Sequence, residues 1–270
     1  SFTTIATGGF STTDASFAAF PGFPQYVSVV FMLLAGLPFL RFLQLLQGDA
    51  KPILFDSQIR TYLIWTSYTV LLITVFRMSA EGNFSEEMFR STLFNVVSIF
   101  SGTGYSDGDV LSWGPFPFAM LFCVGAIGSC SGSTGCSLKV FRYQILLKAV
   151  TAQIRRMYSP SRIVSVKQDG RVVSPEVISS IMLLFTGFIL SFGILIVLIG
   201  MTGVSFMGSV TAAWTSIFNI GPVFGGEVGP SGAVNTFPDP AKWFMIFGML
   251  LGRLEVVSVV VLLLPRFWRT

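Results

Sequence analysis

The sequence predicts an all-α, polytopic membrane protein that contains an internal repeat. Of its 270 residues, 52% are hydrophobic and only 11% are charged, whereas soluble domains have about 25% charged residues. Several apolar stretches approach the roughly 20 residues that a helix needs to cross a hydrocarbon core of about 30 Å. Three glycine-rich segments recur at matching places between these stretches. This composition argues against a nucleic-acid-binding module, a disordered chain and a disulfide scaffold.

Five stretches are predicted to be membrane spans. In chain order they cover about 27–46, 62–76, a third that begins near 116 and is interrupted after 127, 177–199 and 243–264. Two shorter apolar pieces, 88–100 and 206–218, are too short to cross and end in glycine-rich sequence. We predict that these two are re-entrant helices, which enter the membrane and return to the same side.

The distribution of charge predicts which side of the membrane each loop faces. With the loop after the first span in the cytoplasm, 13 of the 17 basic residues are internal and three are external, as the positive-inside rule requires. The external ones are Arg77, Arg90 and Lys242, and Arg253 is left within the last span. Eight of the 13 acidic residues are external. They either concentrate cations at the outer face or serve solubility alone.

Catalytic side chains are scarce. The chain has no histidine, which removes Ser-His and Cys-His catalysis and the commonest zinc ligands. Its three cysteines, Cys123, Cys130 and Cys136, lie in or beside apolar or Gly/Ser-rich sequence, and we expect them to pack as small apolar residues. We therefore expect no enzymatic activity.

The glycine-rich segments carry the internal repeat. Gly8, Gly104 and Gly221 lie 96 and 117 residues apart. A unit of span, short helix, glycine loop and span occurs twice in full, and the chain begins at the loop of an earlier copy. Backbone at membrane depth must be hydrogen-bonded or must line a water-filled path. Extended Thr-Gly strands around a common axis direct carbonyl oxygens inward, where a ring of them replaces the hydration shell of a monovalent cation.

Three motifs carry a resemblance to a known family. They are Thr4 to Gly9, Gly132-Ser133-Thr134-Gly135 leading to Lys139, and Gly252-Arg253-Leu254-Glu255. They resemble the Trk/Ktr/HKT superfamily of K+ transporters, and within it the TrkH/TrkG type, over essentially the whole chain. The resemblance implies four repeats of span, pore helix, filter loop and span around one pore. It also implies K+ uptake across a bacterial inner membrane, a homodimer, and a cytosolic nucleotide-binding (TrkA-like) regulatory subunit.

On this pattern the chain divides at the repeat boundaries. Residues 1–47 hold the filter loop and second span of repeat two, and 61–158 hold repeat three with its broken second span. Residues 176–270 hold repeat four. The segments 48–60 and 159–175 are expected to be cytoplasmic linkers.

Carried over position by position, the resemblance assigns nine filter residues, with K+ as the transported ion. They are Ala6, Thr7, Gly8, Gly102, Thr103, Gly104, Asn219, Ile220 and Gly221. In the resembling transporters a serine at one filter glycine accompanies Na+ transport, so glycine at all three visible positions favours K+.

The third span is interrupted by a segment with poor helix propensity. Residues 125–136 include four glycines, and each costs a helix about 1 kcal/mol relative to alanine. At membrane depth such a run faces a cavity or packs closely against another helix. The resemblance implies an intramembrane gate here, and we assign Gly128, Gly132 and Gly135 to it.

Arg253 is the basic residue that the charge assignment leaves within a span. A charge at this depth usually faces a cavity and pairs with another group. Glu255 is two residues away and points elsewhere on a helix, so we expect the carbonyls and hydroxyls of 125–136 to be its partners. The resemblance implies that this arginine lies below the filter and joins the barrier to permeation.

Two questions stay open on the sequence alone. The segment 139–171 has eight basic residues and one acidic residue, and it binds anionic membrane lipids, docks a regulatory protein, or only faces the cytoplasm. The competing function is a Na+-coupled or other cation-coupled secondary transporter with discontinuous helices. That alternative predicts acidic residues in the spans, where only Glu255 is found.

Overall fold

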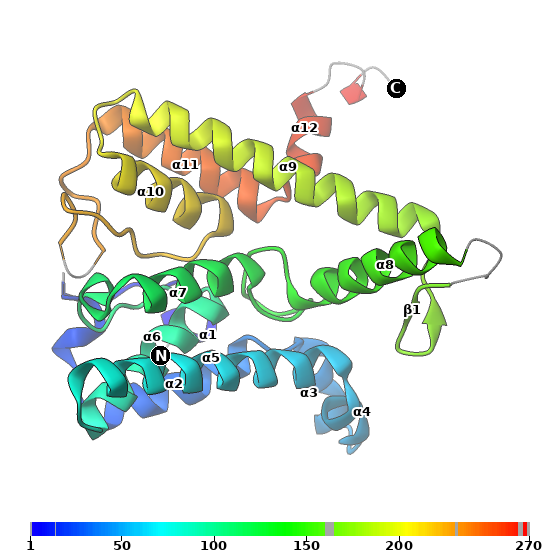
Figure 1. Ribbon diagram of the computed structural model, residues 1–270, viewed down its shortest axis with the longest axis horizontal. Helices are drawn as coiled ribbons and strands as arrows, with labels where there is room; N and C mark the ends of the chain where they lie inside the picture. Colours follow the sequence, from blue (N-terminus) through cyan, green and yellow to red (C-terminus); the bar gives the residue numbers. More distant parts are fainter. Residues whose placement is uncertain (1, 14, 160–164, 230–231, 264–266, 269–270) are drawn as a thin grey trace.

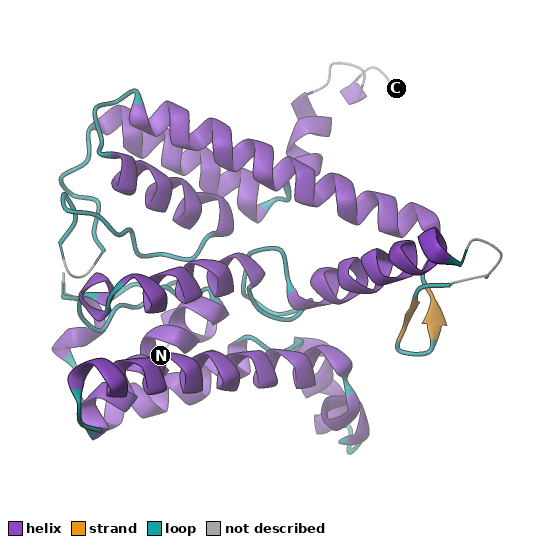
Figure 2. Ribbon diagram, viewed as in Figure 1, coloured by secondary structure: helices purple, strands orange, loops and turns teal. Residues whose placement is uncertain are grey.

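The computed structural model confirms the all-α prediction. It describes residues 2–13, 15–159, 165–229, 232–263 and 267–268. Apart from turns and loops, these residues form helices and one small antiparallel hairpin of β1 (Lys167–Gln168) and β2 (Arg171–Val172), as Figure 2 shows. In the hairpin Lys167 pairs with Val172.

Two copies of one unit follow each other along the chain. The first contains α5 (Ser57–Glu81), α6 (Glu86–Ser101) and α7 (Pro115–Ile127), and the second contains α9 (Pro175–Gly200), α10 (Phe206–Phe218) and α11 (Asp239–Arg253). A glycine-rich loop joins the second helix of each unit to the third. α1 (Phe2–Ile5) and α2 (Phe23–Ala35) are the matching pieces of a partial copy. The two units lie one above the other in Figure 1.

The two short helices, α6 and α10, each begin after a serine that caps the first turn. Ser85 accepts a hydrogen bond from the Met88 N–H at 3.1 Å, and Ser205 accepts one from the Gly208 N–H at 3.3 Å. A serine in this position satisfies one of the N–H groups that the first helical turn leaves without a partner. The helices predicted over 88–100 and 206–218 are therefore found, with their beginnings set by these caps.

Aromatic packing joins the two units around α10, which packs against both α9 and α11. Trp214 is 1% exposed, and its ring stacks on Phe122 of α7 with 5.0 Å between the centroids. Its indole N–H donates to the Phe122 carbonyl oxygen at 3.0 Å. Burying a large aromatic side chain contributes about 1.5–3 kcal/mol, so this contact holds α7 against α10.

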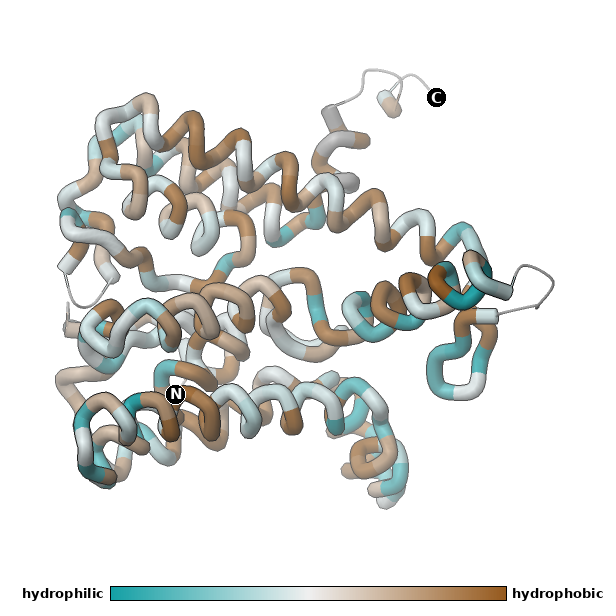
Figure 3. The backbone as a smooth tube through the Cα atoms, in the orientation of Figure 1, coloured by the Kyte–Doolittle hydropathy of each residue, from teal (hydrophilic) through white to brown (hydrophobic). Residues whose placement is uncertain are grey.

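Long apolar helices identify a membrane protein. Among the described residues α5 and α9 are each long and apolar enough to cross a membrane without a break. Ile189, Leu190 and Val197 of α9 are 61–68% exposed. An apolar surface of this extent does not face water in a soluble protein. In Figure 3 hydrophobic residues cover most of α9, and hydrophilic ones gather in the β-hairpin and around α4 (Lys51–Phe55).

The first and last predicted spans are wrong as continuous helices. α2 ends at Ala35, and α3 (Phe39–Leu46) leaves it at an angle of 92°, because Pro38 lacks the N–H that a helix needs and restricts the residue before it. The last predicted span is interrupted in the same way, because α11 ends at Arg253 and a separate helix, α12 (Val256–Leu263), follows it. Glu255, between them, has a left-handed φ of 61°, which a right-handed helix does not accommodate.

The predicted interruption of the third span is found. α7 ends at Ile127, and the chain resumes as α8 (Val140–Tyr158). All three helices that follow a glycine-rich loop are therefore broken, whereas only one break was predicted. We call the segment 128–139 between α7 and α8 the intramembrane loop.

Candidate functional site

The three glycine-rich loops meet around one cavity of about 660 Å³. All nine predicted filter residues line it, and so does Arg253. The predicted gate glycines, which are Gly128, Gly132 and Gly135, do not line it. Segments more than 200 residues apart in the chain thus contribute backbone to a single space.

Each loop leaves its short helix with the same hydrogen bonds. One backbone N–H donates to the carbonyl three residues back, and the next N–H donates to the carbonyl five residues back, at 2.7–3.4 Å. The successive donors are Thr7 and Gly8, Gly102 and Thr103, and Asn219 and Ile220. The first donor of each pair is left-handed, with φ of 49°, 75° and 52° in that order. This arrangement satisfies the last carbonyls of the helix, as in a Schellman motif.

The shared pattern corrects the predicted register by one residue in the first loop. Gly8 was matched with Gly104 and Gly221. By hydrogen bonding, Gly8 corresponds to Thr103, and the residue that corresponds to Gly104 and Gly221 is Gly9. Gly9 also has the positive φ, 64°, that Gly104 and Gly221 have and Gly8 lacks.

Glycine is required where the loops touch. A Cβ atom on Gly104 would lie 2.8 Å from the Gly221 Cα, and one on Gly221 would lie 2.6 Å from the Gly104 Cα. A Cβ on Gly9 would overlap the Thr103 carbonyl oxygen. Real Cβ atoms do not come so close to backbone, so any side chain here displaces a neighbouring loop.

The loops present carbonyl oxygens that have no hydrogen-bond partner. Among the described residues no donor reaches the carbonyls of Gly102, Thr103, Asn219 and Ile220. Ala6 differs, because the Thr7 hydroxyl donates to its carbonyl at 2.8 Å. Since the great majority of carbonyls in folded proteins are paired, this group of unpaired carbonyls around one cavity is an exception to the usual pattern.

The intramembrane loop lies against the ends of all three short helices. Thr134 donates from its hydroxyl to the Ile5 carbonyl at 3.0 Å, and Ser137 donates to the Phe218 carbonyl at 3.0 Å. A Cβ on Gly135 would lie 2.6 Å from the Ser101 carbonyl oxygen. Ile5, Phe218 and Ser101 are the last residues of α1, α10 and α6, so the intramembrane loop lies directly against the helix ends from which the glycine-rich loops begin.

The same loop is hydrogen-bonded to the break between α2 and α3. The Cys130 N–H donates to the Gly36 carbonyl at 3.1 Å, and the Phe39 N–H donates to the Gly132 carbonyl at 3.0 Å. Backbone N–H and carbonyl groups that lose their helical partners at one break therefore hydrogen-bond to the other break. Backbone within a membrane needs such partners.

Arg253 joins the intramembrane loop to the third break. It is the last residue of α11, and its Nη1 donates to the Thr134 carbonyl at 3.1 Å and contacts the Cys136 sulfur. The expectation that this loop supplies its partners is confirmed. Glu255 instead forms an ion pair with Arg142 in the first turn of α8.

Known proteins are similar to this chain in sequence and in fold. A family model described as the TrkH cation transport protein matches residues 1–269. The chain belongs to the TrkH family of cation transport proteins. The Trk system potassium uptake protein TrkI of Halomonas elongata is 33% identical over 269 residues, which are 99% of this chain and 54% of that protein. TrkH of Escherichia coli K12 is 30% identical over 273 residues, which are 100% of this chain and 56% of that protein.

A solved structure supports the same assignment. The crystal structure of the potassium transporter TrkH from Vibrio parahaemolyticus superimposes with a TM-score of 0.89 at 30% identity, and covers 99% of this chain and 58% of that one. The chain therefore spans a little over half the length of the TrkH relatives it matches. These relatives are transport proteins rather than enzymes, in agreement with the expectation from the missing histidines.

Sequence reasoning missed several residues of this TrkH-family site. Gly9 was overlooked because Gly8 follows a threonine, as Gly104 does. Thr134 was considered only as a member of the 125–136 segment and Ser137 was not singled out, although hydroxyls in such a loop are suited to cap helix ends. Arg142 could not be identified from the sequence, because its partner Glu255 lies 113 residues away along the chain.

Proposed function

We propose that this chain forms part of a K+ uptake pathway in which carbonyl oxygens of the three filter loops bind the dehydrated ion. The observation that carries the proposal is the set of unpaired carbonyls of Gly102, Thr103, Asn219 and Ile220 around one cavity. Carbonyl oxygens suit a monovalent cation because they stabilise it without a full negative charge that would hold it too tightly. The chain's relatives are named potassium uptake proteins.

The three short helices favour a cation at this place. Each directs its C-terminus, with its partial negative charge, toward the loops, and such a terminus stabilises a cation by about 0.3–1 kcal/mol. The register of the first loop gives Thr7 and Gly8 the place of Gly102 and Thr103. Their carbonyls, rather than that of Ala6, complete the proposed ligand set.

We infer a gate in the intramembrane loop below the filter. Thr134 and Ser137 tie the loop to the ends of α1 and α10, and Arg253 adds a positive charge on the same cavity. In this state an ion that leaves the filter meets backbone and a cation. Conduction requires the loop to give up these hydrogen bonds and move aside.

The setting of the pathway follows from the family and from charge. We propose a bacterial inner membrane as its location, with the β-hairpin in the cytoplasm, because the basic residues gather on that side. A homodimer and a cytosolic nucleotide-binding subunit of the TrkA type are the proposed partners. The proposed nucleotide site belongs to that partner, since the chain itself has no phosphate-binding glycine motif.

Rubidium uptake tests the proposal. Cells that lack their other K+ uptake systems and express this protein should accumulate Rb+, and K+ should compete better than Na+. The variant Gly221→Ser should reduce this preference. Cells that take up no Rb+ despite a correctly inserted protein, or that do not discriminate K+ from Na+, would contradict it.

A cation-coupled secondary transporter remains the weaker alternative. It predicts an unpaired acidic residue at the site, whereas Glu255 is engaged by Arg142. Uptake that saturates and depends on a Na+ or H+ gradient would favour it.

A further inference from the structure

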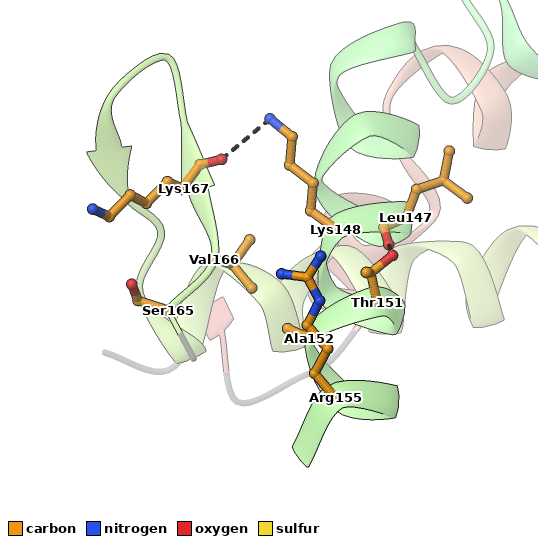
Figure 4. Close-up of a pocket in the computed structure, with 8 residues that line it drawn as sticks. All are labelled: Leu147, Lys148, Thr151, Ala152, Arg155, Ser165, Val166 and Lys167. Carbon is orange, nitrogen blue, oxygen red and sulfur yellow. Dashed lines mark hydrogen bonds between the residues drawn. The ribbon is translucent and has the colours of Figure 1, made fainter. Parts of the chain in front are cut away.

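A second pocket lies at the cytoplasmic end of α8, far along the chain from the filter. It has a volume of about 350 Å³ and is bounded on one side by α8 and on the other by the segment that leads into β1. Lys148, Thr151 and Arg155 line it from α8, and Ser165 and Val166 from the facing segment. Figure 4 shows the Arg155 guanidinium beside Val166, pointing along the pocket toward Lys148.

The pocket carries uncompensated positive charge. The Lys148 Nζ donates to the Lys167 carbonyl at 3.1 Å and to the Gln168 side-chain oxygen at 2.7 Å, and neither acceptor is charged. In the part of the chain that the structure describes, neither Lys148 nor Arg155 forms an ion pair. Among the described residues that line the pocket, none is acidic. An ammonium and a guanidinium with free N–H donors are the groups that bind phosphate oxygens.

Packing against α9 places this pocket at the level of lipid head groups. Tyr143, near the start of α8, packs on Phe185 with 5.0 Å between ring centroids, and Ala149 and Ala152 pack with Ile178. The two helices are therefore antiparallel, and the pocket lies beside the first turns of α9. α9 has 26 residues and is about 39 Å long, longer than a hydrocarbon core of about 30 Å, so these turns reach the membrane surface.

An apolar stripe runs beside the two cations. Leu147, Val150, Ile154 and Met157 are 56%, 47%, 53% and 77% exposed. Their spacing of three and four residues puts them on one face of α8. Lys148 and Arg155 follow Leu147 and Ile154 by one position each, so the charged and apolar stripes are adjacent. An apolar stripe beside basic side chains is typical of a helix end that meets lipid acyl chains and anionic head groups at the membrane surface.

We propose that this end of α8 binds an anionic phospholipid. Its head-group phosphate lies in the pocket between Lys148 and Arg155, and an acyl chain covers the stripe from Leu147 to Met157. A free phosphate would use only the pocket and leave the stripe bare, which is why the lipid is the favoured source of the phosphate group. The site is independent of which ion the protein conducts.

Native mass spectrometry of the detergent-purified protein, titrated with phosphatidylglycerol, tests this directly. The wild type should retain phosphatidylglycerol at least about tenfold more tightly than phosphatidylcholine, which corresponds to about 1.4 kcal/mol. Lys148→Gln/Arg155→Gln should lose this preference. The control, Arg156→Gln/Arg171→Gln, removes the same charge from residues that do not line the pocket and should keep it. Equal loss in both variants would overturn the site.

Two further arms distinguish the sources of phosphate and guard against misfolding. Leu147→Ser/Ile154→Ser keeps the cations and should weaken phosphatidylglycerol binding. Inorganic phosphate at millimolar concentration should not displace the lipid, and full displacement would show a phosphate site instead. If Lys148→Gln/Arg155→Gln does not fold, Thr151→Glu brings a carboxylate to the pocket and should abolish the preference. A wild type with no preference for phosphatidylglycerol would overturn the proposal and leave this basic segment to a protein partner.

Discussion

Arg253 Nη1 donates a hydrogen bond to the carbonyl oxygen of Thr134 at 3.1 Å, across 119 residues of chain. The bond holds a guanidinium on the wall of the cavity that the filter loops also line. Two unit charges 4 Å apart repel by about 4 kcal/mol at an effective dielectric constant of 20. On the proposed pathway, a K+ ion that leaves the filter loops meets this repulsion before it reaches the cytoplasm.

Replacing Arg253 with glutamine should raise cation flux. The substitution keeps a side chain of similar length and removes the charge, so the barrier falls. We expect Rb+ uptake to increase about tenfold or more, since 1.4 kcal/mol of barrier is a factor of ten. Lys242→Gln, at the other end of α11, removes the same charge away from the cavity and should leave uptake unchanged. Uptake by the Arg253 variant that stays at the wild-type rate would exclude this role.

Replacing Gly104 with serine should impair ion selectivity. A Cβ at this position would overlap the Ile220 carbonyl oxygen, so one of the proposed ligands must shift. Gly108 is the matched control, because it has a similar φ of +87° with nothing within 4 Å of a Cβ. Both variants carry the same left-handed strain of about 1–2 kcal/mol. Competition of Na+ with Rb+ uptake should rise for Gly104→Ser alone, and a rise in both variants would assign the effect to strain.

The register of the first loop predicts different effects for two neighbouring glycines. Gly9→Ala should reduce Rb+ uptake strongly, because its φ is +64° and a Cβ would overlap the Thr103 carbonyl oxygen. Gly8→Ala should be milder, because the nearest atom to a Cβ is on the Phe10 ring at 3.2 Å, and a side chain moves more easily than backbone. Uptake assays on the two variants, at matched expression, check the order. The reverse order would restore the match of Gly8 with Gly104.

The ion pair of Arg142 and Glu255 should show a measurable but small coupling. The Glu255 side chain is 42% exposed, and pairs this accessible contribute about 0–1 kcal/mol. A double-mutant cycle of Arg142→Gln and Glu255→Gln, followed by thermal unfolding in detergent, measures the coupling free energy. The exchanged pair Arg142→Glu/Glu255→Arg should recover part of the stability that either reversal loses. Strict additivity of the two single variants would argue against the contact.

Removing the hydroxyl of Tyr62 should not destabilise the protein. The side chain is fully buried and stacks on Phe100, and its oxygen has no hydrogen-bond partner among the described residues. An unpaired buried polar group costs about 1–3 kcal/mol. Tyr62→Phe should therefore leave the melting temperature unchanged or raise it, and the exposed Tyr68→Phe should have no effect. A clear fall for Tyr62→Phe would reveal a partner for the hydroxyl.

Local signals explain which parts of the fold could be predicted from the sequence. The helix over 206–218 was predicted to the residue from its apolar run and the glycine-rich sequence after it, and the structure adds that Ser205 caps its first turn. The break after Ile127 was predicted because four glycines gather there. Helix-capping residues and glycines influence the conformation of the chain within a few positions of themselves, so their effect can be predicted from the sequence.

The remaining features depend on contacts between distant segments. The break after Ala35 is marked only by Gly36 and Pro38 within an otherwise apolar run. The break at Glu255 is stabilised by Arg142, which no local pattern connects to it. The nine expected filter residues were assigned by the family resemblance, but the shift to Gly9 depends on hydrogen bonds that a one-dimensional match of Thr-Gly pairs does not reveal.

The interruptions in the three helices that follow the filter loops have a mechanical consequence. Hydrogen bonds join the breaks after α2 and α11 to the intramembrane loop, which is itself the break after α7. The inner segments α3, α8 and α12 are therefore each linked to the outer half of the molecule through an interruption instead of a continuous helix. On the proposed pathway, ion selection requires a fixed geometry and ion passage requires movement, and we expect these interruptions to place the two requirements in different halves of the bilayer.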